Sequence, residues 1–284
     1  MVGIIISLFE KGILFTFLII GIYISSKVIR FDNMSIEGAF NVGGAVAAIT
    51  LNNYWNPLMS IFFASFCAGV TGLVTAFLYE KLGINRIMSG IIVTTGLFSV
   101  VLILATSNLC IANEAISLFS FWRSSCIYDL SIIMLSLFIF FVIGVMKLFL
   151  CSKMGLLLYT VGCNRQFLIT IGRSPEMYIF LGLFLSNFFA GMSHALFVHY
   201  LGYFSIWFSS GILIKALAGM VLADLVTIAF DYGLILGGVL YQAILVLTIN
   251  FHIHPDWNRL ITAMLIVGVL LVKDENNMIV RERL

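Results

Sequence analysis

The stretch FDNMSIEGAFNVGGAVAAI, Phe31 to Ile49, places Asp32 and Glu37 directly before a run of glycine, alanine and valine. That run is apolar but short, and Asn41 is its only polar side chain. A charge at the centre of a bilayer costs at least about 2.5 kcal/mol, so acids beside an apolar segment are candidates for function. The stretch predicts a short helix whose start carries functional or capping carboxylates.

The composition of the whole chain is that of an integral membrane protein. Its 284 residues are 62% hydrophobic and 10% charged, and the mean hydropathy is +1.13. Lipid offers backbone groups no hydrogen-bond partner, and the alternation of barrel strands is not evident, so the spans are helices. We expect one all-α polytopic domain over residues 1–284. The first apolar run has no basic start and no cleavage site, so we expect it to be retained.

The number of spans follows from the lengths of the apolar segments. A bilayer core of about 30 Å takes about 20 helical residues to cross. The pattern predicts about 8–10 transmembrane helices, of which one, near 34–50, is short or broken. The nine apolar segments are about 12–26, 34–50, 57–79, 87–106, 127–149, 177–200, 211–229, 233–250 and 258–272.

The positions of Lys and Arg predict the orientation, because these residues are retained on the cytoplasmic side. If loop 79–86 is inside, eleven of the fifteen basic residues lie inside. The amino terminus is then outside and the carboxyl terminus inside. The remaining basic residues are Lys11, Arg123, Lys215 and Arg259. In this topology Asp32 and Glu37 lie at the inner end of the second segment, within reach of water or of Lys27 and Arg30.

The inner loop, about 150–176, mixes apolar and basic side chains. A short helix joined by glycine turns, with an apolar face beside basic residues, suits docking onto a partner. The alternative is a surface helix packed beneath its own bundle. The apolar residues are Leu156, Tyr159, Phe167, Leu168 and Ile171, the polar ones are Asn164, Arg165 and Gln166, and the glycines are Gly155, Gly162 and Gly172.

Residues 154–204, MGLLLYTVGCNRQFLITIGRSPEMYIFLGLFLSNFFAGMSHALFVHYLGYF, resemble the coupling loop and following helix of bacterial ABC importer permeases of the branched-chain amino acid and ribose type. The matching residues are Gly155, Leu156, Gly162, Asn164, Gly172, Ser186, Asn187, Ala190 and Gly191. The opening stretch resembles the second segment of the same family through Asp32, Ser35, Glu37, Gly38, Phe40 and Gly43. Residues 55–100 continue the likeness, which covers about 12–272 and is nearest to a subgroup of uncharacterised tryptophan-like or amino-acid permeases. The chain departs from the family pattern at 166–168, at Ala223-Asp224 and at Lys215.

The resemblance implies a permease subunit of an ATP-driven importer that moves a small organic solute by alternating access, with amino acids ahead of sugars or nucleosides. It implies a cytoplasmic ATP-binding subunit, an extracytoplasmic substrate-binding protein and a second permease copy, within the bacterial inner membrane. It also implies an ATPase-coupling loop that contains Gly155, Gly162, Asn164, Arg165 and Gly172. The chain has no GxxxxGK[ST] phosphate loop, so we expect ATP hydrolysis on the partner, no catalytic residues and no cofactor.

Two other classes stay open. A channel or secondary transporter that works without an ATPase would need its own coupling-ion site, and the few acids near segment ends argue against one. A membrane scaffold or sensor is the third class, and no signalling domain is visible in the sequence.

Seven residues are candidates for the translocation path or gate: Asp32, Glu37, Gly38, Asn41, Gly43, Lys215 and Asp224. Each has a structural alternative. Asp32 or Ser35 could cap the helix start, with Glu37 at its positive dipole end. The glycines could serve close helix packing. Lys215 could extend to the outer interface or pair with a substrate carboxylate, and Asp224 could be structural or part of the gate.

Histidines and cysteines give weaker signals. His194 and His199 lie about 140° apart around a helix, so they do not share a face, and no metal site is predicted there or at His252 and His254. Cys110 and Cys126 both fall on the predicted outer side, where an oxidising compartment would allow a disulfide.

Overall fold

The computed structural model describes residues 2–111, 128–226, 230–250, 257, 260–268 and 271. Apart from one short antiparallel strand pair, β1 (Asn108–Cys110) and β2 (Tyr203–Ser205), the regular structure in these ranges is helical. The all-α class is confirmed.

The described part of each apolar segment read from the sequence overlaps a helix, and two of the helices form in the inner loop between two of these segments. The helices are α1 (Val2–Tyr23), a π-helix η1 (Ile24–Val28), α2 (Ile36–Asn52), α3 (Pro57–Glu80), α4 (Arg86–Ala105), α6 (Tyr128–Cys151), α7 (Lys153–Cys163), α8 (Arg165–Thr170), α9 (Pro175–Leu201), a 3₁₀-helix η2 (Ile206–Ser209), α10 (Ile212–Val226) and α11 (Phe230–Asn250). Residues 260–268 are also helical.

Within the described ranges, four helical segments are long and apolar enough to cross a membrane alone: Ile6–Val28, Pro57–Glu80, Arg86–Ala105 and Pro175–Leu201. A fifth span results if the parts of α6 and α7 that meet at a 72° bend are one span. The 17 residues of α2 fall short of that length, as the sequence predicted for this segment.

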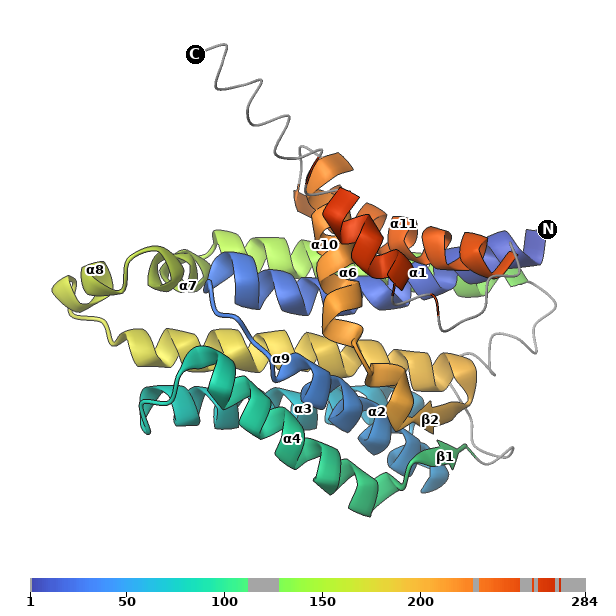
Figure 1. The fold of residues 1–284 in the computed structure, drawn as a ribbon, viewed down its shortest axis with the longest axis horizontal. Coiled ribbons are helices and arrows are strands. Elements are labelled where there is room, and N and C mark those ends of the chain that lie inside the picture. The colour runs from blue at the N-terminus through green and yellow to red at the C-terminus, as the bar shows by residue number, and fades with distance from the viewer. Residues whose placement is uncertain are drawn as a thin grey trace, which may run out of the picture.

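Helix α9 lies at the centre of the fold, packed against α1, α2 and α3 (Figure 1). Most long helices run roughly along one direction, whereas α10 crosses them steeply (Figure 1). In α1 the core includes Leu14, Phe17 and Leu18, which are fully buried. Large apolar side chains on α3, α4 and α6 instead point outward, as lipid permits.

Small residues set how closely the central helices approach. A Cβ atom at Gly43 of α2 would lie 2.4 Å from the Cα atom of Gly191 in α9, and one at Gly72 of α3 would lie 2.3 Å from the Leu183 carbonyl oxygen. Only glycine permits such backbone contact between helices. At Gly43 the structure therefore has the close packing that the sequence left as one of two possibilities.

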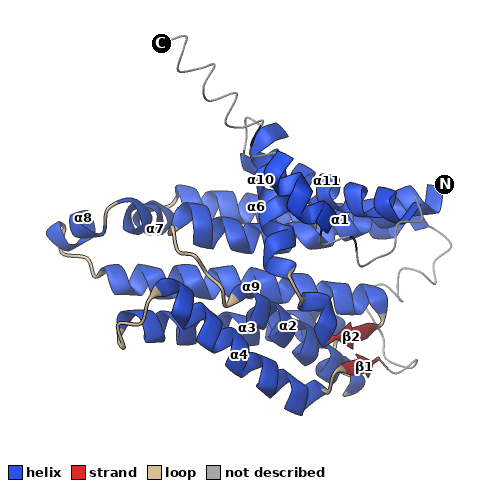
Figure 2. Cartoon of the chain, in the orientation of Figure 1, coloured by secondary structure: helices blue, strands red, loops and turns tan. Residues whose placement is uncertain are grey.

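The two ends of the bundle differ in chemistry. Helices α7 and α8 lie at one end, and β1 and β2 lie at the other (Figure 2). At the α7 and α8 end, ion pairs join Arg165 to Glu80 and Lys81 to Glu176, so the segments after α3 and before α9 are fastened together. The described loops 79–86 and 150–176, which are predicted to share one side of the membrane, thus lie at one end.

Candidate functional site

Helix α2 begins near the middle of α9. An extended linker, 29–35, leads from the end of η1 to the first turn of α2 (Figure 1). Asn33 Nδ2 in this linker donates to Asn187 Oδ1 at 2.9 Å and to Ser186 Oγ at 3.3 Å, and both partners lie near the midpoint of α9. The Met34 carbonyl oxygen accepts from Thr94, half-way along α4.

A buried polar cluster holds this helix start. We define the polar cluster as Asn33, Ser35, Thr71, Ser186 and Asn187, each at most 6% exposed. Asn33 Oδ1 accepts from the N–H and the hydroxyl of Ser35, at 3.1 and 2.6 Å. Asn187 Nδ2 donates to Ser35 Oγ and to Thr71 Oγ1, both at 3.0 Å. The cluster therefore ties the linker, α3 and α9 together by mutually satisfied side chains.

The alternative in which Asp32 or Ser35 caps the helix start with its side chain is wrong, whereas Glu37 does lie in the first turn of α2. Ser35 occupies the N-cap position, but its side chain bonds none of the helix N–H groups, and Asp32 is exposed. Asn33 organises the turn instead, by accepting from the residue two positions later as Asn commonly does in turns.

The expected placement of Glu37 at the inner end is also wrong. Glu37 is half-buried, and its Oε1 accepts from the Gly211 N–H at 3.1 Å, just before α10. The linker carries the chain past η1 before the helix starts, so Glu37 lies beside the start of α10 and does not line the cavity that Lys27 and Arg30 share. Lys215 is half-buried one turn after Gly211, on the helix that starts beside Glu37.

Asn41 lies one helical turn after Glu37, on the same face of α2. It is 2% exposed, and its Oδ1 has no hydrogen-bond partner among the described residues. Gly38, on a different face, packs on α4, where an added Cβ would lie 3.0 Å from the Leu97 side chain and the Thr94 backbone. The buried acceptor of Asn41 beside a carboxylate makes this face of α2 chemically distinct from the packed faces.

Aromatic rings close the space next to this face. The His194 ring stacks on Phe40 with centroids 4.1 Å apart, and its Nδ1 lies 2.8 Å from the Phe40 carbonyl oxygen. Gly44 leaves room for that ring, since a Cβ would lie 2.4 Å from it. The role of His194 is thus packing against α2, and no described group of three His, Cys, Asp or Glu side chains is arranged to hold a metal.

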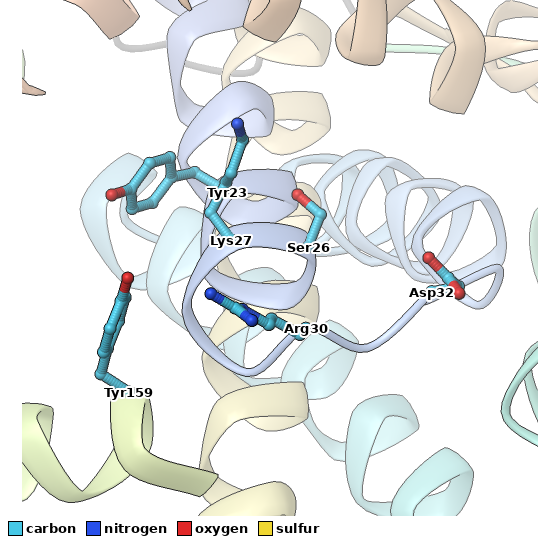
Figure 3. Close-up of a pocket in the computed structure, with 6 residues that line it drawn as sticks. All are labelled: Tyr23, Ser26, Lys27, Arg30, Asp32 and Tyr159. Atoms are coloured by element: carbon cyan, nitrogen blue, oxygen red, sulfur yellow. The ribbon is translucent and has the colours of Figure 1, made fainter. Parts of the chain in front are cut away.

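Asp224 and Asp32 lie elsewhere, near the end of η1. Asp224 Oδ2 accepts from Lys27 Nζ at 2.8 Å, which ties α10 to η1. Asp32 lines a cavity of ≈ 360 Å³ together with Tyr23, Ser26, Lys27, Arg30 and Tyr159 (Figure 3). Asp32 therefore does share a pocket with Lys27 and Arg30, whereas Glu37 does not.

The loop between α6 and α9 forms a second candidate region. We define the coupling surface as the exposed apolar residues of this loop: Met154, Leu156, Tyr159, Phe167, Ile169 and Ile171. Leu158, Val161 and Leu168 face the other way and are buried. One face of this loop therefore packs on the bundle, as the alternative reading expected, and the other face is exposed.

The turns of this loop are built by its polar residues and glycines. Asn164 ends α7 and caps α8, accepting from the Phe167 N–H at 3.1 Å. Gly172 has a positive φ of 72°, which glycine adopts without steric cost. Gly155 lies against the carbonyl oxygens of Phe149 and Leu150, and Gly162 lies against that of Val28.

Arg165 fixes α8 to the bundle. Its Nη1 and Nη2 donate to the two carboxylate oxygens of Glu80 at 3.0 and 2.5 Å. Glu80 is nearly buried, with its side chain 3% exposed. This hydrogen-bonded carboxylate raises the pKa of the Arg165 guanidinium, so Arg165 keeps its positive charge through the physiological range.

The family of the chain is decided by comparison with known proteins. The model of the branched-chain amino acid transport system permease component matches residues 4–270. The chain belongs to this permease family. Membership and the apolar helices together make it a multi-pass membrane protein.

Two relatives of the permease are informative. It is 29% identical to a tyrosine transport system permease protein of Clostridioides difficile (strain R20291), over 96% of this chain and 92% of the relative. It is 27% identical to an uncharacterized protein of Rickettsia prowazekii (strain Madrid E), over 78% of this chain and 76% of the relative. No solved structure matches.

The sequence-predicted residues of the permease fall into separate groups. Glu37 and Asn41 share one face of α2, with Lys215 one turn into the neighbouring α10. Asp32 and Asp224 lie near η1. The loop residues lie on α7 and α8 or in the turns that flank α8. Asn33 was missed, although an Asn two residues before a Ser at a helix start is a recognisable turn signal. Cys110 is exposed in β1, while Cys126, His252 and His254 lie outside the described residues.

Proposed function

We propose that this permease forms the translocation path of an ATP-driven importer for an amino acid or a related small solute, working by alternating access. Family membership over residues 4–270 carries the proposal, and the tyrosine transport relative favours an amino-acid substrate. In this assembly a cytoplasmic ATP-binding subunit, an extracytoplasmic binding protein and a second permease copy complete the transporter. The amino terminus lies outside and the carboxyl terminus inside.

The coupling surface is the proposed contact for the ATP-binding subunit. Its exposed side chains, among them Leu156 at 61% and Phe167 at 53% exposed, lie at the end of the bundle where the basic loops gather. Gly155, Gly162, Asn164, Arg165 and Gly172 shape the turns and contacts that present this surface. The Arg165 to Glu80 pair then transmits movement of α8 to α3, in the manner of packed elements that switch between two arrangements.

The start of α2 is the proposed path and gate. It joins a short helix, a half-buried carboxylate on Glu37 and the amide of Asn41, with Lys215 on the neighbouring helix. Gly38 and Gly43 hold this segment close to α4 and α9. Asp32 and Asp224 contribute at the inner end, where Asp224 secures α10 against η1. Interrupted helices whose ends lie inside a bundle are a common way to build solute sites in transporters.

Co-purification tests this assignment. The detergent-solubilised permease should retain its cytoplasmic ATP-binding subunit when the two are produced together, and Phe167→Ser should reduce that retention. Tyr54→Ser is a matched control, because Tyr54 is 68% exposed at the opposite end of the bundle. The complete complex in proteoliposomes should take up labelled tyrosine only with ATP. Robust uptake by the chain alone would favour the channel or secondary-transporter alternative and would refute the proposed ATP-driven import.

A further inference from the structure

The cavity beside Asp32 has the size of a ligand site and is separate from the start of α2. Its volume of ≈ 360 Å³ falls within the range of about 300–1,000 Å³ usual for small-molecule pockets. The lining comes from the end of α1, from η1, from the linker 29–35 and from α7, through Tyr23, Ser26, Lys27, Arg30, Asp32 and Tyr159.

Two backbone irregularities shape this cavity. Ser26 and Lys27 belong to the π-helix η1, a rare form that occurs frequently at functional sites. Arg30 has a φ of +49°, a left-handed conformation that is costly for a residue other than glycine. The Arg86 guanidinium stabilises it by donating to the Arg30 carbonyl oxygen at 3.1 Å. The fold therefore maintains a strained turn that presents the Arg30 side chain.

The charges in the cavity are incompletely paired. Lys27 bonds to Asp224, but neither the Arg30 guanidinium nor the Asp32 carboxylate bonds to any described residue. Figure 3 shows Tyr23, Arg30 and Tyr159 around one part of the space, while Asp32 stands apart on the linker. Hydrogen-bond donors thus gather on one side, and the acceptor lies on the other.

The position along α1 indicates which ligands reach this cavity. The apolar segment Ile6–Val28 ends here, and tyrosines and basic residues at the end of a span lie at the level of lipid headgroups. Basic pockets between membrane helices on the cytoplasmic side bind lipid headgroups. A lipid headgroup bound here would have its phosphate, and any second polar group that it carries, at the depth in the membrane of Arg30 and Asp32.

We propose that this cavity binds a phospholipid headgroup with a phosphate and a primary amine, as in phosphatidylethanolamine. The phosphate accepts hydrogen bonds from Arg30 and from the phenols of Tyr23 and Tyr159, and the amine donates to Asp32. The proposal takes one point from the proposed function, namely the orientation that places the opening of the cavity on the cytoplasmic side of the membrane. An α-amino acid fits less well. Its carboxylate and its amine are joined through one carbon, whereas Arg30 and Asp32, which the two groups would have to reach at the same time, are too far apart to form an ion pair.

A bound headgroup would connect two elements that the proposed function requires to move. Arg30 and Asp32 lie on the linker that leads to α2, and Tyr159 lies on α7, within the coupling surface. The lipid therefore bridges the loop contacted by the ATPase and the start of the proposed path. Its occupancy would set how firmly α7 is held against η1.

Native mass spectrometry of the full-length chain tests the site. The purified protein is mixed with phosphatidylethanolamine, phosphatidylcholine or phosphatidylglycerol, and retained lipid is counted. Phosphatidylethanolamine should be retained most, because the choline ammonium has no N–H and glycerol has no charge for Asp32. Arg30→Gln should lower its retention about tenfold, the effect of one lost charge-assisted hydrogen-bond partner. Tyr159→Phe should lower it about fivefold.

Asp32→Asn should abolish the preference for ethanolamine while leaving phosphatidylglycerol retention unchanged. Arg173→Gln is the matched control, since it removes an exposed positive charge outside the cavity and should leave lipid retention intact. Equal retention of the three lipids, or equal losses in Arg30→Gln and Arg173→Gln, would refute the site. Displacement of the lipid by free tyrosine or by inorganic phosphate would identify a soluble occupant and refute it too. Because no ATPase takes part, the result is independent of the transport assay.

Discussion

Replacing Asn187 by Leu should measure how strongly the polar cluster holds the start of α2. The Asn187 side chain takes part in three hydrogen bonds, with Asn33, Ser35 and Thr71. Side-chain hydrogen bonds between membrane helices average about 0.6 kcal/mol each, so the three together contribute about 2 kcal/mol. Leucine has a similar size, and so little of the expected loss arises from a new cavity.

The appropriate assay is equilibrium unfolding in mixed detergent micelles, with the full-length protein. Asn187→Leu should lower the free energy of unfolding by about 2 kcal/mol, a change of about thirtyfold in the equilibrium constant. Ser65→Ala is the matched control, because among the described residues buried Ser65 bonds only to the Ile61 carbonyl oxygen of its own helix. A double-mutant cycle with Asn33→Leu should give a non-additive coupling energy. A loss below about 0.5 kcal/mol for Asn187→Leu, or strict additivity, would show that the cluster does not hold α2 in place.

Three further predictions concern packing, the coupling surface and topology. In the same unfolding assay, Gly43→Ala should destabilise the protein by about 1–3 kcal/mol, because the added methyl group would meet the Gly191 backbone. The control Gly96→Ala, which has open space around it, should be neutral or stabilising. Glu80→Gln should raise the rate of amide hydrogen exchange in α8 by up to about fivefold, because the Arg165 side chain is 42% exposed and solvent limits the ion pair to about 1 kcal/mol. The control Lys81→Gln should leave exchange in α8 unchanged. Faster exchange in Lys81→Gln than in Glu80→Gln would exclude the anchoring of α8 by Glu80. Topology is tested with variants that keep a single cysteine. A membrane-impermeant maleimide should label exposed Cys110 from outside, and it should label exposed Cys163 only after permeabilisation. Labelling of both residues from one side would overturn the proposed orientation.

The sequence predicted the helices well because apolar length is a direct signal of a membrane span. It placed all nine segments on helices, and it marked α2 as short. It did not predict the depth at which α2 starts, because hydropathy reports which residues avoid water and not how far a polar linker enters the bundle. Asp32 and Glu37 are only five positions apart, yet the linker and the first turn of α2 separate them into two sites.

The sequence predicted the candidate site only in part, because some of its side-chain partners are far apart along the chain. Ser186 and Asn187 were noted as part of a family pattern, but their partner Asn33 comes from a segment 153 residues away. Side-chain hydrogen bonds across such distances depend on helix register, which a single sequence does not contain. The coupling surface was easier to predict, since its glycines, its basic residues and its apolar side chains are neighbours along the chain.

The starting depth of α2 has an electrical consequence. In its ionised form Glu37 is a negative charge about half-way along a bundle whose helices cross the low-dielectric layer, where most of the transmembrane voltage drops. A charge moved across the whole voltage changes energy by about 2.3 kcal/mol per 100 mV, so a charge moved from the middle to either face changes it by about half that amount. Any rearrangement that carries an ionised Glu37 toward one face is therefore biased by the resting voltage of the cell, and the rate of that step then depends on whether the membrane is energised.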